Sequence, residues 1–446
     1  MVEKNQEYEV DIQDIGVNGE GIARINGYIT FVKGALIGEK ANIKIVKVNK
    51  DYGYGKLLKL IQFSNDREEP MCPNFGRCGG CNLQHLNYEA QLKHKLEVVR
   101  STLRKQLGYE PLVEEIIGMG IPFYYRNKAQ YPVSDGKIGF YSDRSHDLIE
   151  NDVCYIQNEV TDKTAKNVFK ILMDNGINSY DEKSGKGTIR HIITRIAMNT
   201  GELMLILVTN GKTLKNKEKI IKEIVNLHPN VTSIIQNINE ERTNVILGNE
   251  CITLYGQNFI IDRLENYKFK ISPLSFYQVN PLQTEVLYNI AKDFAGLTGE
   301  EIVFDLYCGI GTISIFMADS CKKVYGIEVV PQAIDNAKEN AEMNEVRNTE
   351  FFVGKVEDVL PKLYNDGIKP NVIFVDPPRK GCDSTALETI MNLKPQKLIC
   401  ISCNPATLAR DLKILTKDYF EIEKIKLVDM FPQTNHVETV CALNLK

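Results

Sequence analysis

Residues 302–312 read Ile-Val-Phe-Asp-Leu-Tyr-Cys-Gly-Ile-Gly-Thr, a short apolar strand pattern that runs into a glycine turn. A helical run over 313–318 follows, and a second strand pattern over 323–327 ends on the acid Glu328. The order of strand, tight turn, helix and strand is that of a Rossmann-like parallel sheet with helices on both faces. The sequence therefore predicts an α/β fold.

The spacing of this segment also predicts a nucleoside site. Glu328 lies 19 residues after Gly309, the distance at which a carboxylate at the end of the second strand accepts both ribose hydroxyls. The third glycine of the dinucleotide fingerprint is missing, because Thr312 and Ile313 follow Gly311. A pyrophosphate ligand is thus disfavoured. S-adenosylmethionine, a nucleoside without phosphate, fits, although an ordinary strand–helix turn would show the same glycine pair.

A cysteine, Cys403, stands where another strand pattern ends. The apolar run over 397–401 leads into Ser402-Cys403-Asn404-Pro405, and helical spacing resumes over 406–415. Pro405 cannot continue a strand, so Cys403 is expected at a strand's carboxyl end, where α/β enzymes keep reactive groups. Position alone favours a small buried core residue. The alternative is a nucleophile.

A nucleophilic thiol suits methylation of a pyrimidine at carbon-5, which is too weakly nucleophilic to attack a methyl sulfonium unaided. Thiolate addition to carbon-6 makes an enolate that can attack, and a base must then remove the carbon-5 proton. In the final strand pattern, 435–440, alternation places His436 and Glu438 on one face. Glu438 is the base that we predict, although a glutamate at a strand end is more often solvated and inert.

Two related chemistries are disfavoured by the strand pattern over 371–375, which ends in Asp376-Pro377-Pro378-Arg379. Methylation of exocyclic amines calls for an aromatic residue after the two prolines, where Arg379 stands. Cytosine-5 methylation usually brings a second cysteine at this strand end, and the sequence has none there.

With these motifs the chain resembles the RNA uracil-5 methyltransferases, which modify ribosomal or transfer RNA. The resemblance covers nearly the whole chain. Its motifs are Phe276-Tyr277-Gln278-Val279-Asn280, Asp305-Leu306-Tyr307-Cys308-Gly309-Ile310-Gly311-Thr312, Asp376-Pro377-Pro378-Arg379, Ser402-Cys403-Asn404-Pro405 and His436-Val437-Glu438. The resemblance implies that Cys403 is the nucleophile, Glu438 the base, and Gln278, Tyr307, Glu328 and Asp376 cofactor contacts.

Near the amino terminus, Cys72, Cys78 and Cys81 have the spacing Cys-x5-Cys-x2-Cys among glycines. In a chain without a signal peptide, clustered cysteines more often bind metal than form disulfides. Cys154, the nearest remaining cysteine, resembles the distant fourth ligand of the family's iron–sulfur members. Spacing alone does not separate zinc from a 4Fe-4S cluster. The resemblance favours the cluster, with a structural or RNA-shaping role because methyl transfer moves no electrons overall.

Charge and glycine spacing predict an RNA-binding module at the amino terminus. The net charge is −4, but residues 21–63 hold eight Lys and Arg against Glu39 and Asp51. Short strand patterns with glycine turns predict a small antiparallel barrel that resembles the TRAM domain, an RNA-binding barrel. Further cations lie on a predicted helix over 88–107, and Tyr124-Tyr125-Arg126-Asn127-Lys128 suits stacked bases and phosphates.

We therefore expect three domains: the TRAM-like barrel over 1–63, a central α/β domain with the cysteine cluster over 64–266, and the Rossmann-like methyltransferase domain over 267–446. The function expected is S-adenosylmethionine-dependent formation of 5-methyluridine in structured RNA by a cytoplasmic monomer. No apolar stretch reaches the about twenty residues that a membrane span needs. A non-catalytic RNA-binding or ribosome assembly factor is the alternative, against which Cys403 and Glu438 argue.

As substrate, 23S ribosomal RNA is favoured over transfer RNA. The common bacterial transfer-RNA member of the family lacks both the barrel and the cluster, whereas some archaeal transfer-RNA enzymes carry them.

Overall fold

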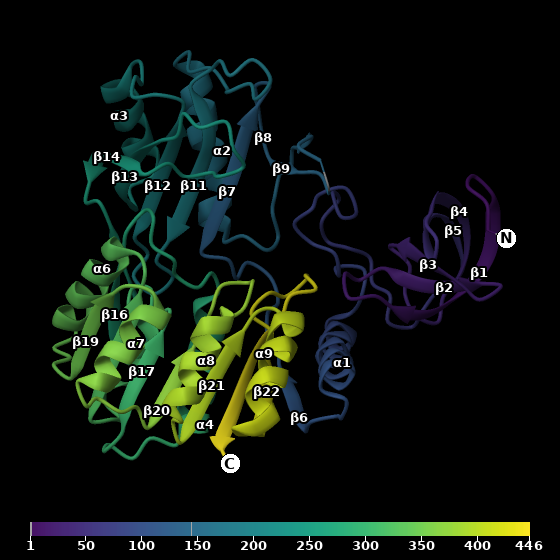
Figure 1. Ribbon diagram of the computed structural model, residues 1–446. Coiled ribbons are helices and arrows are strands. Elements are labelled where there is room, and N and C mark those ends of the chain that lie inside the picture. The colour runs from purple at the N-terminus through teal and green to yellow at the C-terminus, as the bar shows by residue number, and fades with distance from the viewer. Residues whose placement is uncertain (1, 144) are drawn as a thin grey trace.

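The computed structural model describes residues 2–143 and 145–446. A small barrel carries the amino terminus, a second sheet with two helices forms the central part, and a large sheet covered by helices holds the carboxyl terminus (Figure 1). Within the described ranges no helix is long and apolar enough to cross a membrane.

The amino-terminal barrel is closed by five strands in the order β1-β2-β3-β5-β4. The strands are β1 (Glu7–Ile15), β2 (Gly21–Ile25), β3 (Tyr28–Lys33), β4 (Lys40–Val48) and β5 (Tyr52–Gln62). Alternate apolar residues such as Ala41, Ile43 and Ile45 fill its interior. The expectation of an antiparallel barrel is wrong at one pair, because β3 and β5 run parallel. β4 pairs with both β5 and β1, and this order leaves β5 beside β3 in the same direction.

The segment after the cysteines packs on the carboxyl-terminal sheet. Helix α1 (Tyr88–Leu107) begins at the cap residue Asn87, lies between the barrel and the large sheet (Figure 1), and packs against the helix that follows Cys403. Strand β6 (Val113–Ile117) then joins the large sheet as its edge strand. Among the cations of α1, Lys95 is fully buried and pairs with Asp429, so it neither lines an RNA path nor lies on a solvated helix face.

The central part is a six-stranded sheet in the order β14-β13-β12-β11-β7-β8. Its elements are β7 (Lys128–Ser134), β8 (Lys137–Ile138), α2 (Glu159–Asp174), β11 (Ile189–Ile196), β12 (Leu203–Thr209), α3 (Lys217–Leu227), β13 (Val231–Ile238) and β14 (Glu250–Gly256). Two hairpins lie beside it, β9–β10 (Phe140–Tyr141, Leu148–Ile149) and β15–β16 (Ile260–Leu264, Tyr267–Ile271). Tyr125 is buried and donates to the carbonyl of Pro432, so it is not available to stack on a base.

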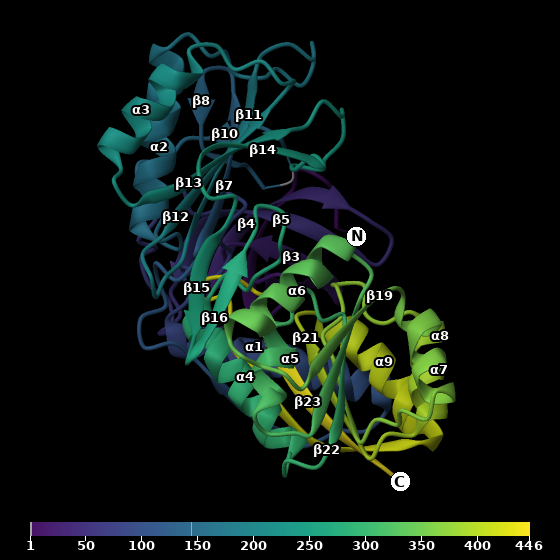
Figure 2. The same ribbon diagram turned by 90° about the vertical axis from the view of Figure 1, so that its left-hand side faces the viewer.

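The carboxyl-terminal sheet has the order β19-β18-β17-β20-β21-β23-β22-β6. Its own elements are α4 (Pro281–Ala295), β17 (Ile302–Leu306), α5 (Thr312–Ala318), β18 (Lys323–Glu328), α6 (Pro331–Met343), β19 (Thr349–Val353), α7 (Val356–Asn365), β20 (Val372–Val375), α8 (Ser384–Leu393), β21 (Lys397–Ser402), α9 (Pro405–Asp418), β22 (Phe420–Val428) and β23 (Glu438–Leu445). Helices α4, α5 and α6 cover one face and α7, α8 and α9 the other (Figure 2), each over its own apolar core. The predicted α/β fold is confirmed.

Candidate active site

The predicted site residues gather at the carboxyl edge of the parallel strands. β17 is followed by Tyr307, β18 ends on Glu328, β20 is followed by Asp376 and β21 by Cys403. Because β17, β18, β20 and β21 run parallel, these four ends lie at the same edge of the sheet.

The turn after β17, where the sequence predicts the nucleoside site, is left-handed. Tyr307, Gly309 and Gly311 all have positive φ, +65°, +54° and +79°. The φ of +79° at Gly311 favours glycine, and a Cβ there would also lie a tight 3.1 Å from the Phe351 ring. One oxygen of Glu328 accepts from the Gly309 amide (3.3 Å) and the other from the Val330 amide (3.0 Å). The carboxylate is thus fixed beside the glycine turn, where the spacing predicted it.

Two aspartates stand near this turn: Asp305, fully buried inside β17, and Asp376, half-buried after β20 on the side of Cys403. Burial raises the pKa of Asp305 to about 7 and that of Asp376 to about 7. One oxygen of Asp305 accepts from the Ser314 hydroxyl (2.5 Å), and the other has no hydrogen-bond partner among the described residues. Asp305 was not singled out from the sequence. A polar residue inside an otherwise apolar strand pattern was the signal that could have found it.

The candidate nucleophile and base lie next to each other. β21 and β23 are antiparallel, their last pair is Ser402 with Thr439, and Cys403 and Glu438 are the next residues outward. Glu438 is buried, with an exposed fraction of 4%, and Cys403 is half-buried. Burial, with the charge of Glu438, raises the pKa of the Cys403 thiol to about 11, while Arg379 opposes the rise. Burial and Asp376 likewise hold the pKa of Glu438 well above its ordinary value, again opposed by Arg379.

The turn that carries Cys403 is tied to the strand end beside it. The Asn404 side chain caps α9 by accepting from the Ala406 amide (3.0 Å), and Pro405 occupies the first helical position. The same side chain donates to the carbonyl of Arg379 (3.1 Å). Ser-Cys-Asn-Pro therefore places the half-buried thiol at the end of β21 and fixes this turn against residues 376–379.

The loop before β23, residues 429–437, is held by other parts of the chain; we name it the base loop. Lys95 donates to Asp429 (2.6 Å). The backbone N–H of Asn435 donates to the side-chain oxygen of Asn82 (2.9 Å), and the side-chain amide of Asn435 donates to the carbonyl of Val17 (3.0 Å). The predicted strand over 435–440 begins later, at Glu438, so His436 lies in this loop.

Gln278 takes no part in the hydrogen bonds that hold Glu328 and the Cys403 turn. It is buried between β16 and α4, and its backbone carbonyl accepts from the Asn127 side chain (2.9 Å). Its side chain makes no hydrogen bond to Tyr307, Glu328 or Asp376 within the part of the chain that the structure describes.

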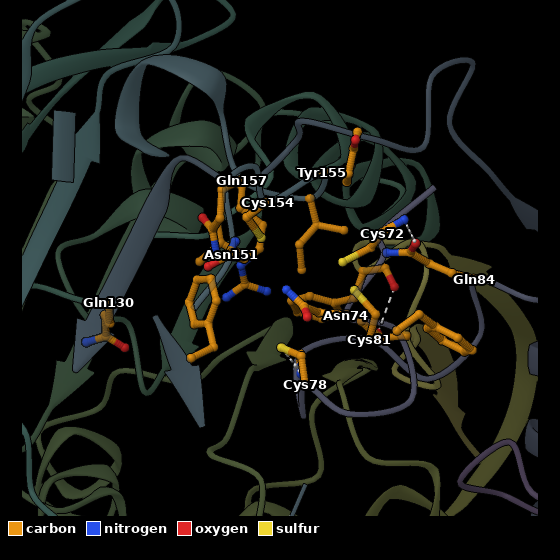
Figure 3. Close-up of a pocket in the computed structure, with 18 of the residues that line it drawn as sticks. Cys72, Asn74, Cys78, Cys81, Gln84, Gln130, Asn151, Cys154, Tyr155 and Gln157 are labelled. Atoms are coloured by element: carbon orange, nitrogen blue, oxygen red, sulfur yellow. Dashed lines mark hydrogen bonds between the residues drawn. The ribbon is translucent and has the colours of Figure 1, made fainter. Parts of the chain in front are cut away.

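All four predicted metal-binding cysteines line one cavity of about 400 Å³ (Figure 3). Burial raises the pKa of Cys81 and of Cys154 to about 12. In residues 2–143 and 145–446 no three Cys, His, Asp or Glu side chains stand close enough to share one metal ion. Of the six remaining cysteines besides Cys403, Cys251 is exposed and Cys382 half-buried; the buried ones are Cys308, Cys321, Cys400 and Cys441.

Comparison with known proteins finds matches along the whole chain. The family model described as tRNA (Uracil-5-)-methyltransferase matches residues 163–446, and the TRAM domain model matches residues 2–58. An uncharacterized RNA methyltransferase of Halalkalibacterium halodurans is 48% identical over 450 residues, which cover 100% of this chain and 98% of that protein. Another, from Listeria innocua, is 49% identical over 450 residues, with 100% and 99% covered.

A solved structure matches along the same length. The crystal structure of Pyrococcus abyssi tRNA (uracil-54, C5)-methyltransferase in complex with S-adenosyl-L-homocysteine has a TM-score of 0.80 and 28% identity, and the match covers 98% of this chain and 99% of that one. The chain therefore belongs to the tRNA (uracil-5-)-methyltransferase family, as an S-adenosylmethionine-dependent RNA methyltransferase with an amino-terminal TRAM domain.

Proposed function

We propose that the protein methylates carbon-5 of a uridine in structured RNA through a covalent adduct between Cys403 and the base. The observation that supports this most is the position of Glu438 beside Cys403 at the ends of β23 and β21. A nucleophile and a separate base are the two groups that the reaction requires. S-adenosylmethionine supplies the electrophilic methyl group.

The residues act in a fixed order in this proposal. The Cys403 thiolate adds to carbon-6, and carbon-5 of the resulting enolate would attack the methyl group of S-adenosylmethionine, whose sulfur–methyl bond breaks to release S-adenosylhomocysteine. Glu438 then removes the carbon-5 proton, the carbon–sulfur bond breaks, and the thiolate leaves with the electron pair. Arg379 favours the ionised forms of both Cys403 and Glu438, as its opposing effect on both pKa values shows. Its positive charge therefore assists both steps.

For the cofactor, we propose that Glu328 accepts both ribose hydroxyls and that Tyr307, Asp376 and Gln278 are further contacts. Support for Glu328 comes from its fixed place beside the left-handed glycine turn. Asp376 is supported by its place between that turn and Cys403. Gln278 rests on the family resemblance alone.

We further propose that Cys72, Cys78, Cys81 and Cys154 hold a 4Fe-4S cluster. The four thiols line one cavity. Zinc and a 4Fe-4S cluster both accept four thiolate ligands, and the family resemblance favours the cluster. The cluster would fix the cysteine segment to the central domain.

The substrate that we propose is 23S ribosomal RNA, in the cytoplasm, with the protein acting as a monomer of the three predicted domains. Transfer RNA is the second candidate, because the Pyrococcus abyssi structure that matches the whole chain is that of a transfer-RNA enzyme.

Mapping 5-methyluridine in both RNA classes, from cells with and without the gene, tests the proposal. Loss of the modification from 23S ribosomal RNA alone supports it. Loss from transfer RNA alone assigns the second candidate, and no loss from either contradicts uracil-5 methylation. A methyl-transfer assay of the purified protein on total RNA separates an enzyme from a binding factor.

A further inference from the structure

The turn that carries Arg379 lies between β20 and α8 and packs against α9; we name residues 378–382 the Arg379 turn. Gly381 in this turn has a φ of +78°, which favours glycine. A Cβ on Gly381 would lie 2.5 Å from the Arg410 guanidinium and 2.8 Å from the Asp411 carboxylate, both on α9. The backbone of the turn is therefore in close contact with two charged side chains of the helix that follows the nucleophile.

These two side chains bind both backbone polar groups of Cys382, at the end of the turn. The N–H of Cys382 donates to one oxygen of the Asp411 carboxylate (2.9 Å), and its carbonyl accepts from the Arg410 guanidinium (3.1 Å). The same guanidinium donates to the other oxygen of Asp411 (2.8 Å). Asp411 has an exposed fraction of only 5%, so its charge-assisted hydrogen bonds are shielded from water and strong.

The start of the turn is held by the amino-terminal end of the same helix. The carbonyl of Arg379 accepts from the Asn404 side-chain amide (3.1 Å) and from the Thr407 hydroxyl (3.4 Å). Within residues 2–143 and 145–446 the side chain of Arg379 makes no hydrogen bond of its own. The place of its guanidinium therefore depends on the backbone of the turn, which α9 holds at both ends.

The charge of Arg379 favours the reactive form of the nucleophile. The charged side chains that act on the Cys403 thiol are Glu438, Arg379 and Asp376, and of these three Arg379 alone is a cation. It opposes the rise in the pKa of Cys403 that burial and the two carboxylates cause. Because the Coulomb energy depends on distance, a displaced guanidinium would leave less of the thiol ionised.

We propose that Asp411, together with Arg410, is a positioning residue for the reaction: it holds the Arg379 turn so that the guanidinium of Arg379 lies beside Cys403. Asp411 makes no hydrogen bond to Cys403 in the part of the chain that the structure describes, so it acts through Arg379. The inference rests on the proposed role of Cys403 as nucleophile and deepens it. It gives a buried acid and its neighbour on α9 a part in activating the thiol.

The test measures how fast iodoacetamide alkylates Cys403 in the full-length protein without RNA, by mass spectrometry of the peptide that contains it. Below the pKa of the thiol this rate follows the thiolate fraction. Asp411→Ala should slow alkylation about threefold or more at about pH 8, and Arg379→Gln at least as much. Asp411→Asn keeps an acceptor for the Cys382 N–H and should slow it less. The matched control is Asp418→Asn, at an exposed acid on the same helix, and it should not change the rate.

A double variant separates positioning from a general structural role. In protein that already carries Arg379→Gln, Asp411→Ala should slow alkylation no further, because the charge that Asp411 positions is already absent. The same extra slowing with and without Arg379 would mean that Asp411 acts on Cys403 by another route, and the proposal would be wrong. Unchanged or faster alkylation in Asp411→Ala, or in Arg379→Gln, would overturn it as well.

Folding is followed in the same samples by thermal unfolding and by affinity for S-adenosylmethionine. If Asp411→Ala does not fold, Arg410→Gln replaces it, since the Arg410 side chain is 45% exposed and its loss removes the donor to the Cys382 carbonyl. Arg410→Gln should also slow alkylation, and an unchanged rate in this variant would contradict the proposal. Because alkylation needs neither RNA nor methyl transfer, failure here is distinct from failure to find 5-methyluridine.

Discussion

Glu438 lies beside Cys403 because β23 runs antiparallel to β21 and begins where β21 ends. Neighbouring strands are about 4.8 Å apart, so a carboxylate on one strand end can reach the pyrimidine ring that a thiol on the other has attacked. Glu438 comes from β23, the last strand in the chain, and lies next to the turn between β21 and α9 that carries Cys403. Turns of this kind, at the carboxyl ends of parallel strands, are where α/β proteins bind ligands.

The first prediction concerns pH. Because burial raises the pKa of the Cys403 thiol to about 11, this group is mostly protonated at neutral pH in the free protein. Cys403 adds to the ring as the thiolate, so adduct formation with 5-fluorouridine RNA should become faster from pH 6 to 9, by up to about tenfold per unit. Arg379→Gln should slow adduct formation at each pH. Arg379→Lys, which keeps the charge, should slow it less. A rate independent of pH over this range would contradict the assignment of an unactivated thiol.

Cofactor binding should depend on Glu328. Replacing it by Ala removes two charge-assisted hydrogen bonds to ribose, each of about 1.5–3 kcal/mol, so affinity for S-adenosylmethionine should fall well over tenfold. Calorimetry measures this, with Glu342→Ala, an exposed acid on α6, as the control. RNA binding should persist. Unchanged cofactor affinity would place the nucleoside pocket elsewhere.

Protein purified without oxygen should be brown and contain iron and sulfide in equal amounts. Cys154→Ser should weaken cluster retention, whereas Cys251→Ser, at an exposed cysteine outside the cavity, should not. Stoichiometric zinc without sulfide would exclude the cluster. Full retention in Cys154→Ser would mean that the fourth ligand is another residue.

The buried pair between Lys95 and Asp429 should be important for stability. Tyr88 also donates to this aspartate (2.8 Å). Lys95→Met leaves the charge of Asp429 buried without its partner, and should lower the free energy of unfolding by about 3–5 kcal/mol. The double variant Lys95→Met, Asp429→Leu should recover much of the loss. Denaturant titration measures the free energy of unfolding of each variant. Equal values for Lys95→Met and the unaltered protein would show that the pair contributes little to stability.

Much of the carboxyl-terminal sheet could be predicted from local pattern. Its apolar runs are bounded by Gly, Pro and Asn, so β17, β18 and β21 begin and end within a residue or so of the prediction. Pairing between distant segments could not be predicted: β6 joins this sheet far from its place in the sequence, and β3 pairs parallel with β5. The buried partner of Lys95, Asp429, is 334 residues away, which no local pattern reveals.

For the site, reaction chemistry pointed to Cys403 and Glu438, and strand-end spacing pointed to Glu328. Gln278 required family resemblance, because nothing in its local sequence distinguishes it from a polar residue before a helix. The place of Arg379 between the catalytic residues and the cysteine cavity depends on how two domains pack, and only the structure shows it.

The order of action of the two catalytic residues is the central claim, and trapping of RNA on the protein tests it most directly. Unaltered protein, Cys403→Ala and Glu438→Gln are each mixed with substrate RNA and labelled S-adenosylmethionine, denatured, and resolved for RNA–protein adducts, with Cys251→Ser as the control. Glu438→Gln should accumulate a methylated adduct that survives denaturation, because the carbon-5 proton has no acceptor, and Cys403→Ala should form no adduct and no product. Release of methylated RNA at the unaltered rate by Glu438→Gln, or any turnover by Cys403→Ala, would contradict the account.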